Sequence, residues 1–422
     1  MTGKKPDENA LIDRFSRRHL LAASAAMTAG LAGCLGGSDD SETANSETDD
    51  GDDDGDGPDP VEQDEVPGPG AAVVEDPPDA VYLPTHREAF EFLPMEQAGD
   101  YVLMPHFTYA HTFWLMRGDQ REEVPPAPQT LHLMFAFWDA ETGEMLPVDV
   151  AGTMEVWKDG ERVDGPRNPW PMISQGMGFH FGDNVPFASA DHDASFPEEG
   201  TYEIELQLDP IGARKTGDFA GRFEEPVSTT FEFEFSIEDF EAITEGIEFF
   251  DEERWGERGA ISLMGHGGGH DDTHEDGHGD EDGHDSHDGY DHPNMALPSA
   301  DTYPGHHIGS YESHDADFVV QYLEDSRLAE DGENYLFVSP RTPYNRVPLP
   351  DMALSVEGDI DGVLAQTLDS ELGHHYGMTV DLTDGEEFDL IVESPPQVAR
   401  HQGYETAFID MPAMSVEVSL DD

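Results

Sequence analysis

The chain has 422 residues, 36 % of them hydrophobic, which is enough for two or three domains with buried cores. Its 93 Asp and Glu residues outnumber its 20 Lys and Arg residues, giving a formal charge of −73. Nucleic acid is therefore excluded as a partner, because phosphate binding needs basic patches. The single cysteine, Cys34, excludes an internal disulfide. Such an acidic surface repels itself unless concentrated salt screens it, so the composition indicates a halophilic source.

Residues 1–34 predict a twin-arginine lipoprotein signal. Arg17 and Arg18 precede a run of Leu, Ala and Gly that is too short to span a bilayer, and LAGC, which ends at Cys34, resembles a lipobox. We expect a lipid on Cys34 to hold the exported protein at the outer face of the cell membrane. An ordinary cleaved signal with an incidental cysteine is the alternative. Residues 35–79 are mostly acidic and polar, which predicts a disordered tether.

Strand patterns begin near residue 80. Hydrophobic residues occupy every second position in TLHLMFAFWD (130–139), GTYEIELQLDP (200–210) and TTFEFEFSI (229–237). Asp159-Gly160 and Asp384-Gly385 stand where hairpin turns are expected. Many short strands with turns between them predict an all-β fold of two immunoglobulin-like antiparallel β-sandwich domains, at 80–240 and 315–422.

Residues 241–314 predict a linker between these sandwiches. A short helix is expected at 237–250, with Ser236 as its N-cap. Residues 265–292 consist mainly of His, Asp, Glu and Gly, cannot form a core, and predict a disordered segment. Imidazole and carboxylate groups there would capture divalent ions, zinc among them; a solvated loop is the alternative. The auxiliary metal tract contains His266, His270, His274, His278, His284, His287 and His292.

Two pairs of related strings predict a degenerate internal duplication. GFHFGDNV (178–185) and GHHYGMTV (373–380) share glycines, a histidine and a valine at an offset of 195 residues, and a turn and a strand follow each. PIGARKTG (210–217) and PQVARHQG (396–403) then match at four of eight positions.

The first string has the composition of a metal site. His180 lies between aromatic residues and glycines, and Met172 and Met177 precede it closely. Imidazole and thioether groups together favour copper or Fe(II) over calcium or magnesium. A hydrogen-bonded core histidine, with methionines as filler, is the alternative.

The stretch PMISQGMGFHFGDNV (171–185) resembles the periplasmic iron- and copper-binding lipoproteins known as Fe2+ transport proteins, of the pathogen-specific membrane antigen type. Their pattern is a Met-Pro-Met turn, then Gly-Pro-His-Tyr-Gly-x-Asn-Val, and later an Arg-His pair. The resemblance implies an immunoglobulin-like sandwich that binds iron or copper, a role in iron uptake beside a membrane permease, and a homodimer. It implies that Met172 and His180 are ligands in the first sandwich, and His375 and His401 in the second.

Both sandwiches depart from that pattern. In the first sandwich, Arg214 is followed by Lys215 instead of the histidine of the family's Arg-His pair. In the second, Thr367 stands eight residues before His375, which leaves Met352 as the nearest upstream methionine and His374 as an additional imidazole.

His106 and His111 are the candidates for the missing histidine of the first sandwich. If their strand is regular, they point to opposite faces, so that only one of them faces His180. The family's early His-Leu-Glu strand has no clean match. His132 falls on the polar face of its strand, and we expect it to face solvent.

The leading interpretation is a lipid-anchored extracellular protein that captures iron or copper through Met and His ligands for uptake. A structural or interaction lipoprotein that presents two sandwiches on a stalk, without metal, is the alternative. Three or more ligands that converge near His180 or His375 would distinguish the two. We expect no enzyme, because the sequence has no nucleophile elbow, HExxH motif or phosphate loop.

Overall fold

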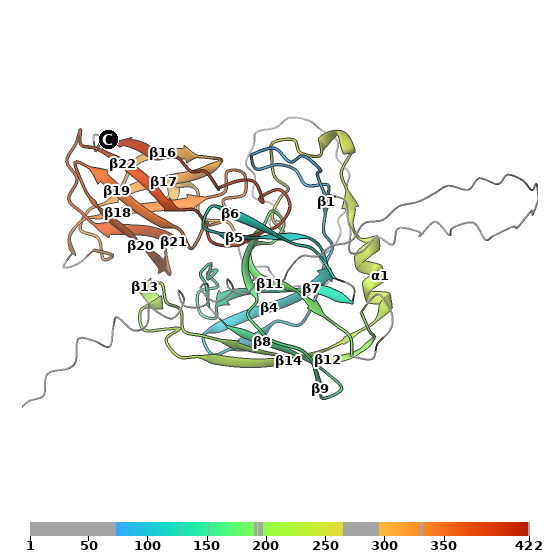
Figure 1. The fold of residues 1–422 in the computed structure, drawn as a ribbon. Helices are drawn as coiled ribbons and strands as arrows, with labels where there is room; N and C mark the ends of the chain where they lie inside the picture. The colour runs from blue at the N-terminus through green and yellow to red at the C-terminus, as the bar shows by residue number, and fades with distance from the viewer. Residues whose placement is uncertain are drawn as a thin grey trace, which may run out of the picture. The chain divides into compact units, whose positions relative to one another are not determined.

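A computed structural model describes residues 73–127, 129–150, 152–189, 192, 197–264, 295–329 and 332–420. These residues form strands and, among them, one α-helix, so the predicted all-β fold is confirmed (Figure 1). Cys34 and the auxiliary metal tract lie outside the described residues. In the described part of the chain, no helix is both long and apolar enough to cross a membrane.

The first sandwich consists of a nine-stranded and a four-stranded sheet. The larger sheet runs in spatial order through β2 (Glu91–Phe92), β4 (Tyr101–Tyr109), β7 (Thr130–Asp139), β11 (Gly178–Pro186), β10 (Trp170–Ser174), β23 (Ala399–Arg400), β5 (Phe113–Arg117) and β6 (Gln120–Val124), with β3 (Glu96–Ala98) also paired to β4. The smaller sheet runs through β14 (Val227–Phe235), β12 (Gly200–Leu208), β8 (Thr153–Lys158) and β9 (Glu161–Arg167). β1 (His86–Arg87) pairs separately with β15 (Glu248–Phe249).

The period-two pattern sorts two kinds of side chain to the two faces of the nine-stranded sheet. On one face, phenylalanines pack against the four-stranded sheet: the rings of Phe107 and Phe233 lie 5.5 Å apart, and those of Phe135 and Phe231 5.7 Å apart. Residues opposite each other on antiparallel strands point to the same side, so the pairing register defines the other face. We call it the Met/His face; it carries Met104, His106, His132, Met134, Met172 and His180.

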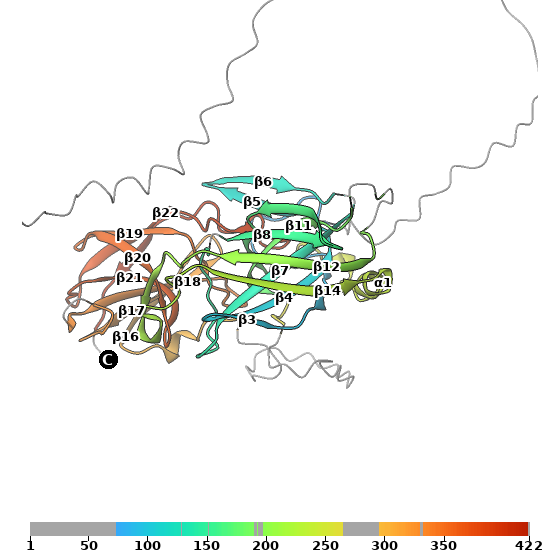
Figure 2. The same ribbon diagram turned by 90° about the horizontal axis from the view of Figure 1, so that it is seen from below.

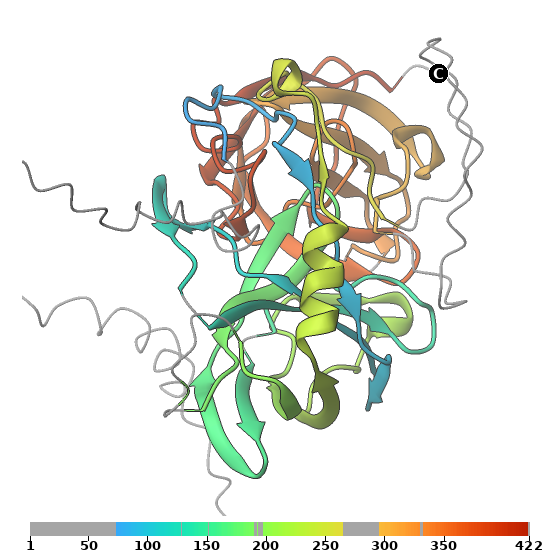
Figure 3. The ribbon, with the colours of Figure 1, turned by 90° about the vertical axis from the view of Figure 1, so that its right-hand side faces the viewer.

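The Met/His face is covered. Next to it, the segment from Val81 to Glu88 runs along the loop that follows β23: Tyr82 N donates to Gly403 O, and Thr85 N donates to the Gln402 side chain (Figure 3). His132 is 0 % exposed, so the expectation that it faces solvent is wrong. A period-two pattern shows that a strand has a second face, but it does not show whether a distant segment of the chain covers that face.

The second sandwich is a single sheet that bends into two layers. It runs through β16 (His306–Ser313), β17 (Ala316–Leu323), β18 (Tyr335–Arg341), β21 (Gly373–Thr379), β20 (Gly362–Asp369), β19 (Ala353–Gly358), β22 (Glu387–Ser394) and β24 (Met414–Glu417). β20 pairs with β19 through residues 362–364 and with β21 through residues 365–369, so the sheet turns a corner there. The first strand, β16, lies within the range 241–314 that we expected to be linker.

The two sandwiches lie side by side (Figure 2), and they exchange short strands. β23, which follows β22 of the second sandwich, pairs in parallel with β10, placing Ala399 opposite Met172. Reciprocally, β13 (Arg214–Thr216), which follows β12 of the first sandwich, pairs in parallel with β20, placing Arg214 opposite Thr367. The exchanged strands come from the matching strings PIGARKTG and PQVARHQG, and the described residues form one compact unit.

Three local predictions have clear outcomes. Asp159 and Gly160 both adopt positive φ and join the paired strands β8 and β9, as expected of a two-residue hairpin turn. The helix α1 (Ile237–Glu245) begins at the predicted cap, where Ser236 and Asp239 form a capping box. The prediction of a hairpin at Asp384-Gly385 is wrong. The turn there joins β21 to β22, but these two strands do not pair with each other; β22 pairs with β19 and β24.

Candidate metal centre

Four buried histidines from distant parts of the chain meet beside the Met/His face. His132 belongs to β7 and His180 to β11, whereas His111 follows β4 and His401 follows β23. Ligand nitrogens of His111, His132 and His401 all lie within 4.8 Å of one another. The Nε2 atom of His180 lies 3.2 Å from Nε2 of His401. We call these four residues the histidine cluster.

Backbone carbonyl groups orient two of the rings. The Nδ1 atom of His180 lies 3.2 Å from Gly178 O, and that of His111 lies 3.2 Å from Tyr109 O. A carbonyl oxygen only accepts, so each Nδ1 carries the proton and each Nε2 presents its lone pair. In protein metal sites a ligating histidine is held in this way, because its second nitrogen donates to a fixed acceptor.

Asn184 orients the third ring. Its Nδ2 donates to His111 O over 2.8 Å, which turns its Oδ1 towards His132 Nδ1 at 3.0 Å. Because this oxygen accepts, Nε2 of His132 keeps a lone pair. This buried nitrogen has no hydrogen-bond partner among the described residues. A buried polar atom without a partner is costly, and a metal ion would satisfy it.

His401 lies between two of these lone pairs. Its Nδ1 is 3.2 Å from Nε2 of His111, and its Nε2 is 3.2 Å from Nε2 of His180. In its neutral form His401 carries one N–H and donates to only one neighbour, so its other nitrogen then faces the lone pair of the second neighbour with a lone pair of its own. A cation bound among the rings removes this conflict.

Glu88 adds a negative charge to the cluster. Its Oε1 lies 3.5 Å from Nε2 of His111 and 3.7 Å from Nδ1 of His401. Burial raises the pKa of this carboxyl group, but His111, His401 and His86 outweigh burial and bring the pKa below its ordinary value. At neutral pH the carboxylate therefore faces the imidazoles and would offset the charge of a bound cation.

Burial favours the neutral form of His111, His132 and His180. It lowers the pKa of His111 to about 4, although Glu88 opposes the shift. It lowers the pKa of His132 and of His180 well below 6.5, and neighbouring imidazoles add to the effect. Neutral imidazole is the form that binds metal.

Met172 brings a thioether to the same region. It lies opposite His180 on the adjacent strand, and it is fully buried. A Cβ atom placed on Gly182 would lie 3.1 Å from both Sδ of Met172 and Nε2 of His132. The missing side chain of Gly182 thus leaves a small space that both donor atoms face.

The structure places His106 close to His180 and brings His111 into the histidine cluster through His132 and His401. His106 shares the Met/His face, lies near enough to lower the pKa of His180, and packs between the rings of Phe90 and Phe92. His111 reaches the cluster because β4 ends at Tyr109, so strand alternation no longer fixes its direction. The expectation that only one of the two histidines faces His180 assumed that the regular strand continues to residue 111.

Among its described residues, the second sandwich brings no comparable set together. The ring of His375 stacks on Phe337 at 4.5 Å, and Thr367 lies opposite it, at the position that Met172 holds opposite His180. His374 contacts Gln366, and Met352 meets the hydroxyl of Tyr376 through its backbone N–H. In the part of the chain that the structure describes, the only group of three or more His, Cys, Asp or Glu side chains with converging ligand atoms is His111, His132 and His401.

Sequence reasoning missed two residues of the centre. His132 lies in a strand that is apolar on both faces, with Met134 and Ala136 beside it, and such a strand is buried on both sides. That signal would have placed His132 inside. Glu88 precedes the first long strand in a segment without periodicity; the signal that could have found it is His86-Arg87-Glu88, which keeps the first and third residues of the His-Leu-Glu pattern.

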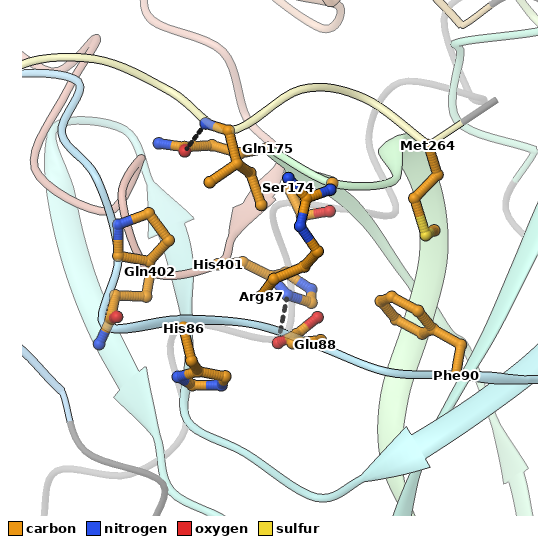
Figure 4. A pocket seen from close by; sticks show the side chains of 12 residues that line it. His86, Arg87, Glu88, Phe90, Ser174, Gln175, Met264, His401 and Gln402 are labelled. Carbon is orange, nitrogen blue, oxygen red and sulfur yellow. Dashed lines mark hydrogen bonds and ion pairs between the residues drawn. The ribbon is translucent and has the colours of Figure 1, made fainter. Parts of the chain in front are cut away.

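A cleft of about 40 Å³ reaches the cluster from outside (Figure 4). His401 and Glu88 both line it, and the contact between them is drawn as a dashed line. Met264, Arg87 and His86 also line it. His86 contacts the hydroxyl of Tyr109 and the side chain of Thr85, so both of its ring nitrogens have partners.

Comparisons with known proteins cover parts of the chain. Residues 301–417 match a domain of unknown function, DUF7350. Among solved structures, a copper-bound variant of FetP from uropathogenic Escherichia coli strain F11 is 19 % identical over 36 % of this chain and 97 % of that chain, with a TM-score of 0.24. A copper-bound variant of Campylobacter jejuni P19 is 14 % identical over 35 % of this chain and 98 % of that chain, with a TM-score of 0.25. A search of curated proteins finds no match.

Gly182→Ala is expected to weaken metal binding while leaving the fold intact. Its φ is not in the left-handed region, so alanine fits the backbone, but the new methyl group would lie 3.1 Å from the two donor atoms. Isothermal titration with Cu(I) or Cu(II) measures the loss. Gly212→Ala is the matched control, since nothing lies within 4 Å of its added Cβ. Equal affinities in both variants would contradict a site beside Gly182.

Proposed function

We propose that this protein is an exported, lipid-anchored metal carrier that holds copper or iron at the histidine cluster and passes it on for uptake. The observation that carries the proposal is the convergence of imidazole nitrogens around His401, where two neighbours present lone pairs at 3.2 Å. Buried polar atoms are normally satisfied, and a metal ion would satisfy both the lone pair to which His401 does not donate and Nε2 of His132. Binding without chemical turnover is part of the proposal.

The donor set supports copper most directly. Several imidazoles and the thioether of Met172 are borderline to soft ligands, which suit Cu(I) and Cu(II), and also Fe(II). Copper heads the affinity order of divalent first-row metals for such ligands. Glu88 would add one oxygen donor near His111 and His401, a combination that Fe(II) also accepts.

Metal titration of the full chain tests this function. We expect one tight site that survives replacement of all seven histidines of the auxiliary metal tract by serine, and several weaker sites that this replacement removes. Elemental analysis identifies the metal in protein purified without added chelator. A parent protein with no tight site for copper, iron or zinc would overturn the proposal and favour the interaction lipoprotein.

Cys34→Ser is expected to detach the protein from the membrane. Without the cysteine thiol no lipid can be attached, so the chain should move to the soluble exported fraction or remain an unprocessed precursor. Fractionation of cells with an antibody to the protein measures this. A Cys34→Ser protein that fractionates like the parent would contradict the anchor.

A further inference from the structure

The histidine cluster has restricted contact with solvent. His132 and His180 are 0 % exposed, His401 is 4 % and His111 is 8 % exposed. An ion that loses its water shell needs replacement ligands throughout its path, because an unpaired charge in an apolar interior is strongly unfavourable. The cleft lined by His401 and Glu88 offers such a path, since about 40 Å³ holds a few water molecules or one ion (Figure 4).

Two side chains along the cleft can replace the water ligands that the ion loses. Met264 brings a half-buried thioether to its wall, and its backbone N–H donates to Gly176 O over 2.9 Å, which fixes this part of the chain. Glu88 is the acidic residue of the lining; its side chain is 19 % exposed, yet it touches His111 and His401. Glu88 is therefore in contact with both the cleft and the cluster.

The charge of the lining also permits a cation to pass. Arg87 lines the cleft, but its guanidinium lies 3.6 Å from the Glu248 carboxylate, which offsets its charge. In the sequence, Met264 stands two residues before His266, the first histidine of the auxiliary metal tract.

We propose that this cleft is the path of the metal, and that a soft cation passes from Met264 to Glu88 and then to His401 and His111. The proposal rests on the proposed function and adds to it a route and a chemical preference. A thioether binds Cu(I) well and Zn(II) poorly, so Met264 selects the reduced copper ion on the way in. No bond beyond metal coordination forms or breaks.

Stopped-flow loading of the full-length protein tests the route. Met264→Leu is expected to slow loading with Cu(I) and its release by the same factor, so that the dissociation constant stays unchanged, while loading with Zn(II) keeps its rate. A residue that lies only on the path changes both rates together, whereas a ligand of the final site changes the affinity.

Glu88→Gln is expected to slow loading with both ions about tenfold, because it removes the negative charge that attracts them. Met378→Leu, in β21 of the second sandwich, is the matched control.

The outcomes separate the two proposals. Unchanged Cu(I) loading in Met264→Leu, or a changed affinity with an unchanged loading rate, would overturn the route alone. Equal slowing of Cu(I) and Zn(II) in this variant would overturn the selective role of the thioether. Absence of tight binding in the parent protein would overturn the proposed function, and the route with it.

Discussion

His401→Ala is expected to weaken metal binding by at least ~100-fold, although this residue belongs to the chain segment of the second sandwich. His401 is the residue that joins the cluster, with one nitrogen 3.2 Å from His111 and the other 3.2 Å from His180. Removing its ring leaves the remaining imidazoles without the ligand between them. Titration with Cu(I), Cu(II) and Fe(II) measures the effect.

His375→Ala is the matched control for this variant. It also removes a buried imidazole, in this case from the string GHHYGMTV, where the ring stacks on Phe337 and faces Thr367. We expect it to lower the free energy of unfolding and to leave metal affinity unchanged. Loss of a tight site in His375→Ala, with His401→Ala unaffected, would place the metal site in the second sandwich instead of at the histidine cluster.

Acid is expected to destabilise the metal-free protein as the pH falls from about 6.5 to 4. Burial lowers the pKa of His111 and of His375 to about 4, and that of His374 to about 3. In this window the unfolded chain binds protons that the folded chain excludes, so stability is present above pH 6.5 and is lost towards pH 4. A shift from 6.5 to about 4 corresponds to roughly 3 kcal/mol for one histidine. Urea unfolding at pH 7 and pH 5 measures this loss.

The variant His375→Gln separates the histidine effect from that of the many carboxylates. Glutamine is not protonated, so the difference in unfolding free energy between parent and variant should shrink as the pH falls. A constant difference would contradict the buried, neutral imidazole. Bound metal should shift acid unfolding to lower pH, because protons and metal compete for the same nitrogens.

The strands that alternate cleanly were predictable from sequence. In β12 and β14 the hydrophobic residues face the sandwich and the polar residues face water, so period two defines both the strand and its orientation. The cap at Ser236 and the turn at Asp159-Gly160 depend on local chemistry and were also predictable. Asp384-Gly385 has the same local chemistry, but pairing of the flanking strands is a tertiary property that the dipeptide does not determine.

The histidine cluster was predictable only in part, because its members come from separate elements. The string around His180 and the Arg-His pair at Arg400-His401 are visible in the sequence, but we expected them to serve different sandwiches. Strand exchange brings them together, and no local pattern encodes it. It also moves Lys215 beside β20, where its Nζ donates to Ile211 O.

Exchange of β23 has a further consequence for the molecule as a whole. His111 and His401 are 290 positions apart in the chain, and an ion bound by both would close that long loop. In extracellular proteins a disulfide often provides such a link, and its stabilising effect grows with loop length. This chain has a single cysteine, in the predicted leader, and so cannot form one. A metal ion among the imidazoles would then act as a reversible cross-link between the sandwiches, and unloading the cargo would loosen the carrier.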